Sequence, residues 1–187
     1  MSAAEKQADD PPRPALQAAW QFFLIHFSIT MLPMKTNAVR LLDAQGVEYQ
    51  LRTYEIEDEH FSAEQVADLV GMPYERVFKT LITLGDRSGP ILALVPAGTD
   101  LDLKLLASAS GNKKVELAPF KQVLDLTGYE RGAVTPLGVK RTYPVFIEET
   151  AILWETIALS GGMKGLQIVI KPQDLIEVLD ARLADLV

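Results

Sequence analysis

Apolar residues gather along the chain in short runs separated by glycine, proline and charged residues. Runs of this length that are rich in valine, isoleucine, leucine and threonine are typical of strands. The runs at 77–84 and 91–95 are joined by Gly85-Asp86-Arg87-Ser88-Gly89, which predicts a hairpin. The other strands are expected at 47–54, 145–147, 155–159 and 166–170.

Capping residues mark helices between these strands. Thr36 suits the N-cap of a helix that ends at Gly46. The Ser62-Ala63-Glu64-Gln65 segment has the spacing of a capping box for a helix that ends at Gly71. We expect this second helix to bury its apolar positions, which are Val66, Leu69 and Val70. Further helices are expected from Thr99 or Asp100 to Gly111, after Pro119, and from Pro172 onward.

The predicted elements follow one another in mixed order, without a repeat and without regular alternation of strand and helix. This order favours an α+β domain, in which helices cover a curved mixed sheet or a partial barrel. A chain of 187 residues with 48% hydrophobic content is large enough for one full core. We expect a single domain over residues 34–187.

Residues 1–33 differ from the rest of the chain. An acidic opening with several prolines precedes an apolar stretch, 20–32, that is too short and interrupted to span a membrane comfortably. It also lacks the basic start and the small-residue cleavage site of a secretory signal. We expect residues 1–33 to be an extension outside the domain, with the natural start at Met34. The alternative is an amphipathic arm that docks on a partner or a membrane surface, and mass spectrometry of the natural N-terminus distinguishes the two.

Composition narrows the possible chemistry. The chain has no cysteine, so it can form neither a disulfide nor a cysteine nucleophile, and this suits a reducing cytoplasm. Only two histidines occur, His26 and His60, and no metal-binding spacing is present, so we expect no metal and no cofactor. The net charge of -7 argues against coating of DNA or other nucleic acid without regard to sequence. It leaves room for a local basic patch.

Lys79 stands inside the apolar strand-like run 77–84. A buried ammonium is costly unless it meets an anion, a polarised carbonyl or a hydrogen-bond acceptor. The simpler interpretation is a lysine on the solvent face or at a sheet edge, where lysine opposes aggregation. Alternation puts Lys79 on one face with Val77 and Leu81, and Thr80 on the other with Phe78, and neither face is plainly polar.

Two glycine-bearing loops follow downstream. Gly132-Ala133-Val134-Thr135-Pro136 belongs to a long loop that runs from 127 to 140, and Ser160-Gly161-Gly162 lies between two expected strands. The first is either a plain surface loop or a rigid rim whose backbone amides point at an oxyanion or a carbonyl. The second is either a tight turn or bare backbone that lets a substrate approach closely. Tyr54 and Phe61 flank an acidic segment, and they are either core aromatics or the wall of a small pocket.

From Met34 to the end, the chain resembles the YbaK/EbsC family of aminoacyl-tRNA deacylases. Several motifs occur in the same order as in that family. They are Arg52-Thr53-Tyr54-Glu55, Val77-Phe78-Lys79-Thr80-Leu81, Leu101-Asp102-Leu103-Lys104, Lys113-Lys114-Val115-Glu116, Thr127-Gly128-Tyr129, Gly132 to Pro136 with Leu137-Gly138, and Leu159-Ser160-Gly161-Gly162 with Gly165-Leu166.

The resemblance implies an enzyme that acts in trans on mischarged tRNA, most closely on cysteine attached to tRNA(Pro). Cysteine and proline are close in size, so a synthetase pocket alone rejects cysteine poorly. It further implies Lys79 as the essential lysine, prolyl-tRNA synthetase as a partner, and the substrate's own sulfur as the nucleophile that closes to a thiolactone. The implied pocket residues are Tyr54, Phe61, Thr80, Ser160, Gly161 and Gly162, with Gly132, Ala133, Val134, Thr135 and Pro136 as the loop that holds the substrate.

Two positions depart from the family pattern. Ala133 stands where the family has a second glycine, and its methyl group could restrict the backbone. Gln167 stands where the family has an acidic residue near the site, and an amide does not stabilise a cationic amine as a carboxylate does. The sequence therefore leaves open an alanine-clearing activity, and also a tRNA- or synthetase-binding module without turnover.

Overall fold

The computed structural model describes residues 35–55 and 61–187. The predictions about residues 1–33 and His60 therefore lie outside the described residues. The elements, in chain order, are α2 (Asn37–Gln45), β1 (Tyr49–Thr53), α3 (Ala63–Val70), η1 (Tyr74–Arg76), β2 (Val77–Gly85), β3 (Gly89–Pro96), α4 (Leu103–Ala109), β4 (Val115–Leu117), η2 (Phe120–Gln122), α5 (Val123–Thr127), β5 (Val145–Glu148), η3 (Glu149–Leu153), β6 (Ile157–Ser160), β7 (Leu166–Ile170), α6 (Pro172–Leu179) and β8 (Arg182–Ala184).

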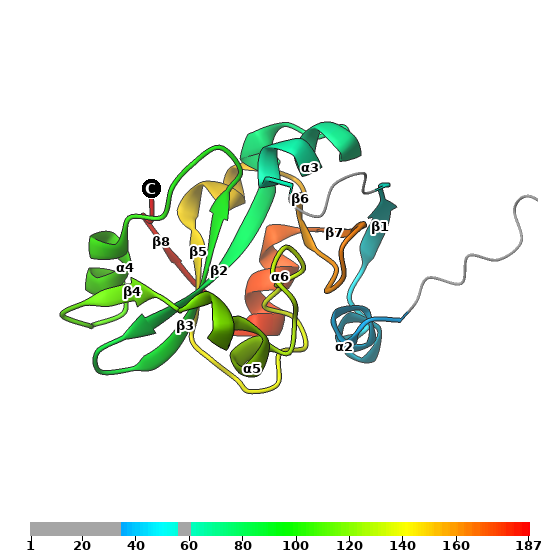
Figure 1. Cartoon of the computed structure of the whole chain (residues 1–187). Coiled ribbons are helices and arrows are strands. Elements are labelled where there is room, and N and C mark those ends of the chain that lie inside the picture. Colours follow the sequence, from blue (N-terminus) through cyan, green and yellow to red (C-terminus); the bar gives the residue numbers. More distant parts are fainter. Residues whose placement is uncertain (1–34, 56–60) are drawn as a thin grey trace, which may run out of the picture. The chain divides into compact units, whose positions relative to one another are not determined.

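The strands form one mixed sheet in the order β1-β7-β6-β2-β3-β5-β8, and β4 pairs with β2 beside this path. The β2–β3 pair is an antiparallel hairpin, as predicted, whereas β2 runs parallel to β6 and β3 runs parallel to β5. Figure 1 shows β2 and β3 as the long central strands. The sheet does not close, because β1 and β8 stand at its two ends. The expected α+β class with a mixed sheet is confirmed.

Alternate residues of each strand face opposite sides, so the sheet builds a core on both of its faces. One face carries Phe78, Leu92, Leu94 and Leu159, and packs against apolar residues of α2 and α6. The opposite face is covered by α3 over the β6 and β7 side, and by α4 over the β3 and β5 side. The sheet is therefore a middle layer between helices (Figure 1).

The predicted helix ends agree with the structure in α2 and α3. The Thr36 hydroxyl accepts a hydrogen bond from the Val39 N–H, and Ser62 and Gln65 form the reciprocal capping box. Both helices end at a glycine with positive φ, 67° at Gly46 and 65° at Gly71, which is the left-handed conformation that glycine adopts at low cost.

Two expectations need correction, and two strands were not predicted. Leu69 is 56% exposed, because the buried side of α3 runs through Val66, Ala67 and Val70. The helix expected from Thr99 or Asp100 begins later, since Asp102 is its N-cap and accepts hydrogen bonds from two backbone N–H groups. Strands β4 and β8 were not expected, and each has three residues, too few to show an alternating pattern.

None of the helices within residues 35–55 and 61–187 has the length and apolar character needed to cross a membrane.

Candidate functional site

The sheet has an opening beside the middle of β2. On the side of β2 that faces away from β3, β6 pairs only with Val77 and Phe78, whereas β4 pairs only with residues 83–85. Residues 79–82 therefore have a strand on one side only. The Lys79-Thr80 pair of the sequence motif lies at this opening.

The peptide group of Thr80 faces the opening. The Ala97 N–H donates to the Val77 carbonyl at 2.7 Å, so the odd-numbered residues of β2 exchange hydrogen bonds with β3 and the even-numbered residues point the other way. On that other side, the Ile82 carbonyl accepts a hydrogen bond from the Ala118 N–H at 3.0 Å. Thr80 lies between the two covering strands, so its backbone N–H and C=O are directed at whatever fills the opening.

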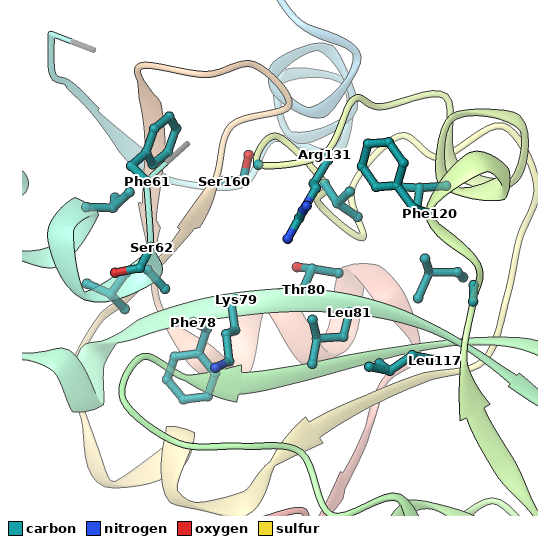
Figure 2. Close-up of a pocket in the computed structure, with 18 of the residues that line it drawn as sticks. Phe61, Ser62, Phe78, Lys79, Thr80, Leu81, Leu117, Phe120, Arg131 and Ser160 are labelled. Atoms are coloured by element: carbon teal, nitrogen blue, oxygen red, sulfur yellow. The ribbon is translucent and has the colours of Figure 1, made fainter. Parts of the chain in front are cut away.

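A pocket of about 440 Å³ occupies this opening. Its walls come from the start of α3, the middle of β2, the segment after β4, the loop 128–144, and the facing ends of β6 and β7. In Figure 2, Phe61 and Ser160 lie on one side of the pocket and Arg131 and Phe120 on the other, with Lys79, Thr80 and Leu81 on β2 below them. A volume of this size is typical of sites for small ligands.

Lys79 lines the pocket and is half-buried. Within the described residues, its ammonium forms no hydrogen bond and no ion pair, although the Glu64 carboxylate is near enough to feel its charge. The pKa of Glu64 lies below its usual value mainly because of the Ser62 hydroxyl, with Lys79 as a smaller cause. Since Glu64 also accepts a hydrogen bond from the Gly98 N–H at 2.7 Å, it is already engaged elsewhere.

Several polar atoms beside the pocket are buried without a hydrogen-bond partner in the described structure. They are the hydroxyl oxygens of Tyr54 and Thr80 and the side-chain oxygen of Gln167. Gln167 lies opposite Ser160 in the β6–β7 pair, and both residues line the pocket. A buried polar group without a partner is costly, so Thr80 and Gln167, which line the pocket, favour a polar ligand there that would supply hydrogen bonds.

Tyr54 lies behind the pocket wall. Its ring packs edge-on against Phe61, with ring centroids 5.9 Å apart, and only Phe61 of the two lines the pocket. Burial raises the pKa of Tyr54, and the neighbouring Gln167 amide and Gly165 backbone oppose this shift. The phenol therefore stays protonated at neutral pH and can donate a hydrogen bond.

The loop 128–144 contributes two of its five predicted residues to the pocket surface. Gly132 and Val134 line the pocket, whereas Ala133, Thr135 and Pro136 are buried beneath the rim. Gly132 has a φ of 82°, and a Cβ built on it would meet nothing closer than 3.7 Å. Ala133 does not have a positive φ, so its methyl group does not restrict the backbone here, contrary to what its departure from the family pattern suggested.

The turn at 161–165 plays a different part. Gly161 and Gly162 do not appear among the described residues that line the pocket. A Cβ on Gly161 would lie 2.7 Å from the Leu166 side chain, and one on Gly162 would lie 2.8 Å from the Tyr129 ring. Their lack of a side chain thus allows close internal packing, and substrate contact by either glycine stays a prediction.

Two residues that line the pocket were not predicted from the sequence. Arg131 directly precedes the predicted loop segment and extends toward Thr80 in Figure 2. Phe120 follows Pro119 and lies beside Arg131, whose guanidinium carbon is 5.4 Å from the Phe120 ring centroid. Among the described residues that line the pocket, Lys79 and Arg131 are the charged ones, and both are cations. The described part of the site is therefore basic, although the chain as a whole is acidic.

The described part of the chain contains no group of three histidine, aspartate or glutamate residues that could hold a metal ion.

Comparison with known proteins identifies the family. The model of the aminoacyl-tRNA editing domain matches residues 57–178, which is more than half of the chain. A protein of Enterococcus faecalis, provisionally named Cys-tRNA(Pro)/Cys-tRNA(Cys) deacylase EbsC, is 39% identical over 152 residues, which cover 81% of this chain and 93% of EbsC. The chain therefore belongs to the aminoacyl-tRNA editing domain family.

Two further proteins resemble this chain, one in sequence and one in fold. A proline--tRNA ligase of Thermodesulfovibrio yellowstonii is 33% identical over 79 residues, which cover 42% of this chain and 14% of the ligase. A crystal structure provisionally described as a trans-editing enzyme for prolyl tRNA synthetase superimposes with a TM-score of 0.74, covers 84% of this chain and 98% of its own, and is 23% identical. This last likeness concerns the fold.

Proposed function

We propose that this protein is a trans-acting aminoacyl-tRNA deacylase that removes cysteine from mischarged tRNA(Pro). The proposal rests mainly on the position of Lys79. This lysine is half-buried at the opening in the sheet, and its ammonium has no partner among the described residues. The chain also belongs to the editing-domain family. The relative EbsC, with the same domain over most of its length, is named for deacylation of Cys-tRNA. The substrate would be met in the cytoplasm, where tRNA is charged.

The aminoacyl ester is already an activated acyl group, so the protein needs to supply position and charge. In our proposal the ester carbonyl lies beside the Lys79 ammonium and the peptide N–H of Thr80. These donors stabilise the negative charge that develops on the carbonyl oxygen during attack. Their effect is strongest in a pocket that excludes water.

The nucleophile in this proposal is the cysteine thiol of the substrate, since the chain has no cysteine. The sulfur attacks the carbonyl carbon of its own aminoacyl group, and the ester bond to the tRNA breaks. The thiol proton passes to the ribose oxygen that leaves, and water later opens the cysteine thiolactone. The pocket holds the reacting atoms close together, and proximity of this kind accounts for a large part of the acceleration.

The amino group of the substrate would meet the acceptors on the opposite wall. The Gln167 side-chain oxygen is buried and without a partner in the described structure, and the Ser160 hydroxyl lies beside it in the β6–β7 pair. Both can accept a hydrogen bond from an ammonium group. Because Gln167 is neutral, it stabilises that ammonium less than a carboxylate does. For this reason two alternatives remain, which are the editing of alanine and a non-catalytic binding module.

Prolyl-tRNA synthetase is the partner that this function implies, because it is the source of Cys-tRNA(Pro). Proline--tRNA ligases contain a related segment.

The test compares three substrates with the full chain. tRNA(Pro) is charged separately with cysteine, serine and alanine, and release of each amino acid is followed under single-turnover conditions. We expect cysteine to be released at least about a hundredfold faster than alanine, since alanine lacks an internal nucleophile. Serine, which has a hydroxyl in place of the thiol, should also be slow, because a thiol is far more acidic than a hydroxyl.

Equal release of cysteine and alanine would contradict the part assigned to the substrate thiol. No release of any of the three by the folded protein would reject the enzyme and support the binding module.

A further inference from the structure

A second hollow adjoins the pocket. It has a volume of about 460 Å³, and the residues that line both cavities are Phe61, Phe120, Val123, Arg131 and Gly132. Its own walls add Lys121 and Leu124 from the η2–α5 segment and Lys164 from the β6–β7 turn. A ligand that leaves the pocket on this side therefore passes directly into the hollow.

Phe120 presents its ring to solvent in this hollow. It is 68% exposed, so it contributes little to the core, and it follows Pro119 in the short η2 turn. The Arg131 guanidinium carbon lies 5.4 Å from the ring centroid. An exposed aromatic ring with a guanidinium beside it is the arrangement on which proteins stack the bases of single-stranded nucleic acids.

The charge of the hollow suits a phosphate. Among the described residues that line it, Lys121, Arg131 and Lys164 are positive and Glu130 is negative. The whole chain has 18 basic and 25 acidic residues, so this excess of positive charge is local. Positive charge beside an aromatic ring matches the two parts of a nucleotide, its phosphate and its base.

We propose that the hollow binds the nucleotide that precedes the terminal aminoacyl nucleoside of the tRNA. Its base stacks on Phe120, and its phosphates lie near Arg131 and Lys121. The proposal rests on the proposed function, because it takes the aminoacyl nucleoside to occupy the pocket. The hollow would then give the protein affinity for the single-stranded end of any tRNA, independently of the amino acid.

The experiment uses the full chain and two substrates, Cys-tRNA(Pro) and the cysteinyl ester of adenosine, which has no preceding nucleotide. The variants are Phe120→Ala and Phe120→Tyr, and Leu153→Ala is the matched control because Leu153 is 75% exposed and lies outside both cavities in the described structure. We expect Phe120→Ala to raise the ratio of KM for Cys-tRNA(Pro) to KM for the cysteinyl ester about tenfold. Phe120→Tyr, which keeps the ring, and Leu153→Ala should leave that ratio within about twofold of wild type.

A binding measurement separates this proposal from the proposed function. Fluorescence anisotropy gives the Kd of an uncharged RNA oligonucleotide that ends in CCA, and it requires no turnover. We expect Phe120→Ala to raise this Kd about tenfold. If wild type binds the oligonucleotide but releases no amino acid, the proposed deacylase function is rejected, whereas nucleotide binding in the hollow is still supported.

Lys121 tests the phosphate contact. The Kd of the same oligonucleotide is measured over a range of salt concentrations for wild type, Lys121→Gln and the control Arg182→Gln, which lies on the edge strand β8. Loss of one phosphate contact should lower the slope of log Kd against log salt by about 0.7 in Lys121→Gln and leave it unchanged in the control.

An unchanged KM ratio and Kd in Phe120→Ala would overturn the proposal. The same would hold if Phe120→Ala weakened binding to prolyl-tRNA synthetase while leaving both nucleic-acid measurements unchanged, since the hollow would then be a protein-docking surface.

Discussion

The loop 128–144 and the turn 161–165 both bring glycines to the neighbourhood of the pocket, yet the two are built differently. Gly132 stands at an open rim, where an added Cβ would meet only ordinary contacts at 3.7 Å and 3.9 Å. Gly161 and Gly162 stand in a closely packed turn, where an added Cβ would lie within 2.8 Å of other side chains. One glycine segment thus forms part of the pocket surface, and the other supports it.

Tyr129 joins the two segments. Its ring packs against Gly162, and its hydroxyl donates a hydrogen bond to the Leu137 carbonyl at 2.7 Å within the long loop. Thr127, which is fully buried, fixes the Tyr129 backbone by accepting a hydrogen bond from its N–H at 3.0 Å. The long loop is thus tied at Tyr129 and Leu137 although it contains no helix or strand, and this suits a rim that positions a substrate.

Gly162→Ala should destabilise the protein more than the other substitutions in these two segments. The new methyl group would collide with the buried Tyr129 ring at 2.8 Å, and the φ of 86° is unfavourable for alanine. Overpacking and the left-handed backbone together should cost about 3 kcal/mol in the free energy of unfolding. Urea denaturation measures this cost, and a loss below about 1 kcal/mol would show that the turn can relax around the methyl group.

Tyr129→Phe should cause the second largest loss in the free energy of unfolding. The ring and its contact with Gly162 remain, but the buried Leu137 carbonyl loses its hydrogen bond. An unsatisfied buried carbonyl costs about 1–2 kcal/mol. The measurement is urea denaturation at neutral pH, with Tyr143→Phe as a control, because the Tyr143 hydroxyl also donates to a backbone carbonyl, that of Leu126, but is only partly buried. A wild-type midpoint in Tyr129→Phe would remove the support that we assign to this hydroxyl.

Alkaline pH provides an independent check of the Tyr129 environment. Burial raises the pKa of Tyr129 from 10.0 to about 12. A pKa that is higher in the folded state stabilises the fold fully below pH 10, and this contribution is lost as pH rises through 12. Burial, with a hydrogen bond to Asp43, also raises the pKa of Tyr49 to about 12, so it adds to the same loss. Tyr129→Phe should therefore lose less stability than wild type between pH 10 and pH 12, and an identical loss in both proteins would contradict this.

Gly132→Ala should have the smallest effect on stability. Its φ of 82° is unfavourable for alanine by about 1 kcal/mol, but no steric collision adds to this cost. Its effect on deacylation should be larger than its effect on unfolding, because Gly132 lines the pocket. If Gly132→Ala destabilised the protein as much as Gly162→Ala, this would contradict the claim that Gly132 lies at an open rim and Gly162 in a closely packed turn.

Sequence patterns predicted much of the fold because they act locally. The capping box at Ser62, the cap at Thr36 and the alternation in β2 each depend on neighbouring residues. They also placed Lys79 in a strand, and the structure puts it at the pocket. Leu69 was expected to be buried because we placed every apolar position of this helix on the core side. The helix α3 is only two turns long, and its buried side is narrow and excludes Leu69.

Other parts of the site depend on contacts between distant segments, which a local pattern does not contain. Whether a glycine lines a pocket or packs against a ring is decided by what faces it, as Gly132 and Gly162 show. Arg131 and Phe120 meet because the long loop folds back over the η2 turn. The opening in the sheet arises because β6 and β4 pair with opposite ends of β2, and β4 itself was not predicted.

Single-turnover release of cysteine from Cys-tRNA(Pro) by the full chain and by its Lys79→Ala variant tests whether catalysis takes place at the opening in the sheet. Lys104→Ala, which removes an exposed lysine outside the pocket, is the matched control, and urea denaturation verifies that all three proteins fold. We expect Lys79→Ala to be slower by a factor of about 10²–10³, the loss typical of one group that stabilises an oxyanion. A folded Lys79→Ala protein that releases cysteine at the wild-type rate would show that the catalytic site is not at this opening in the sheet.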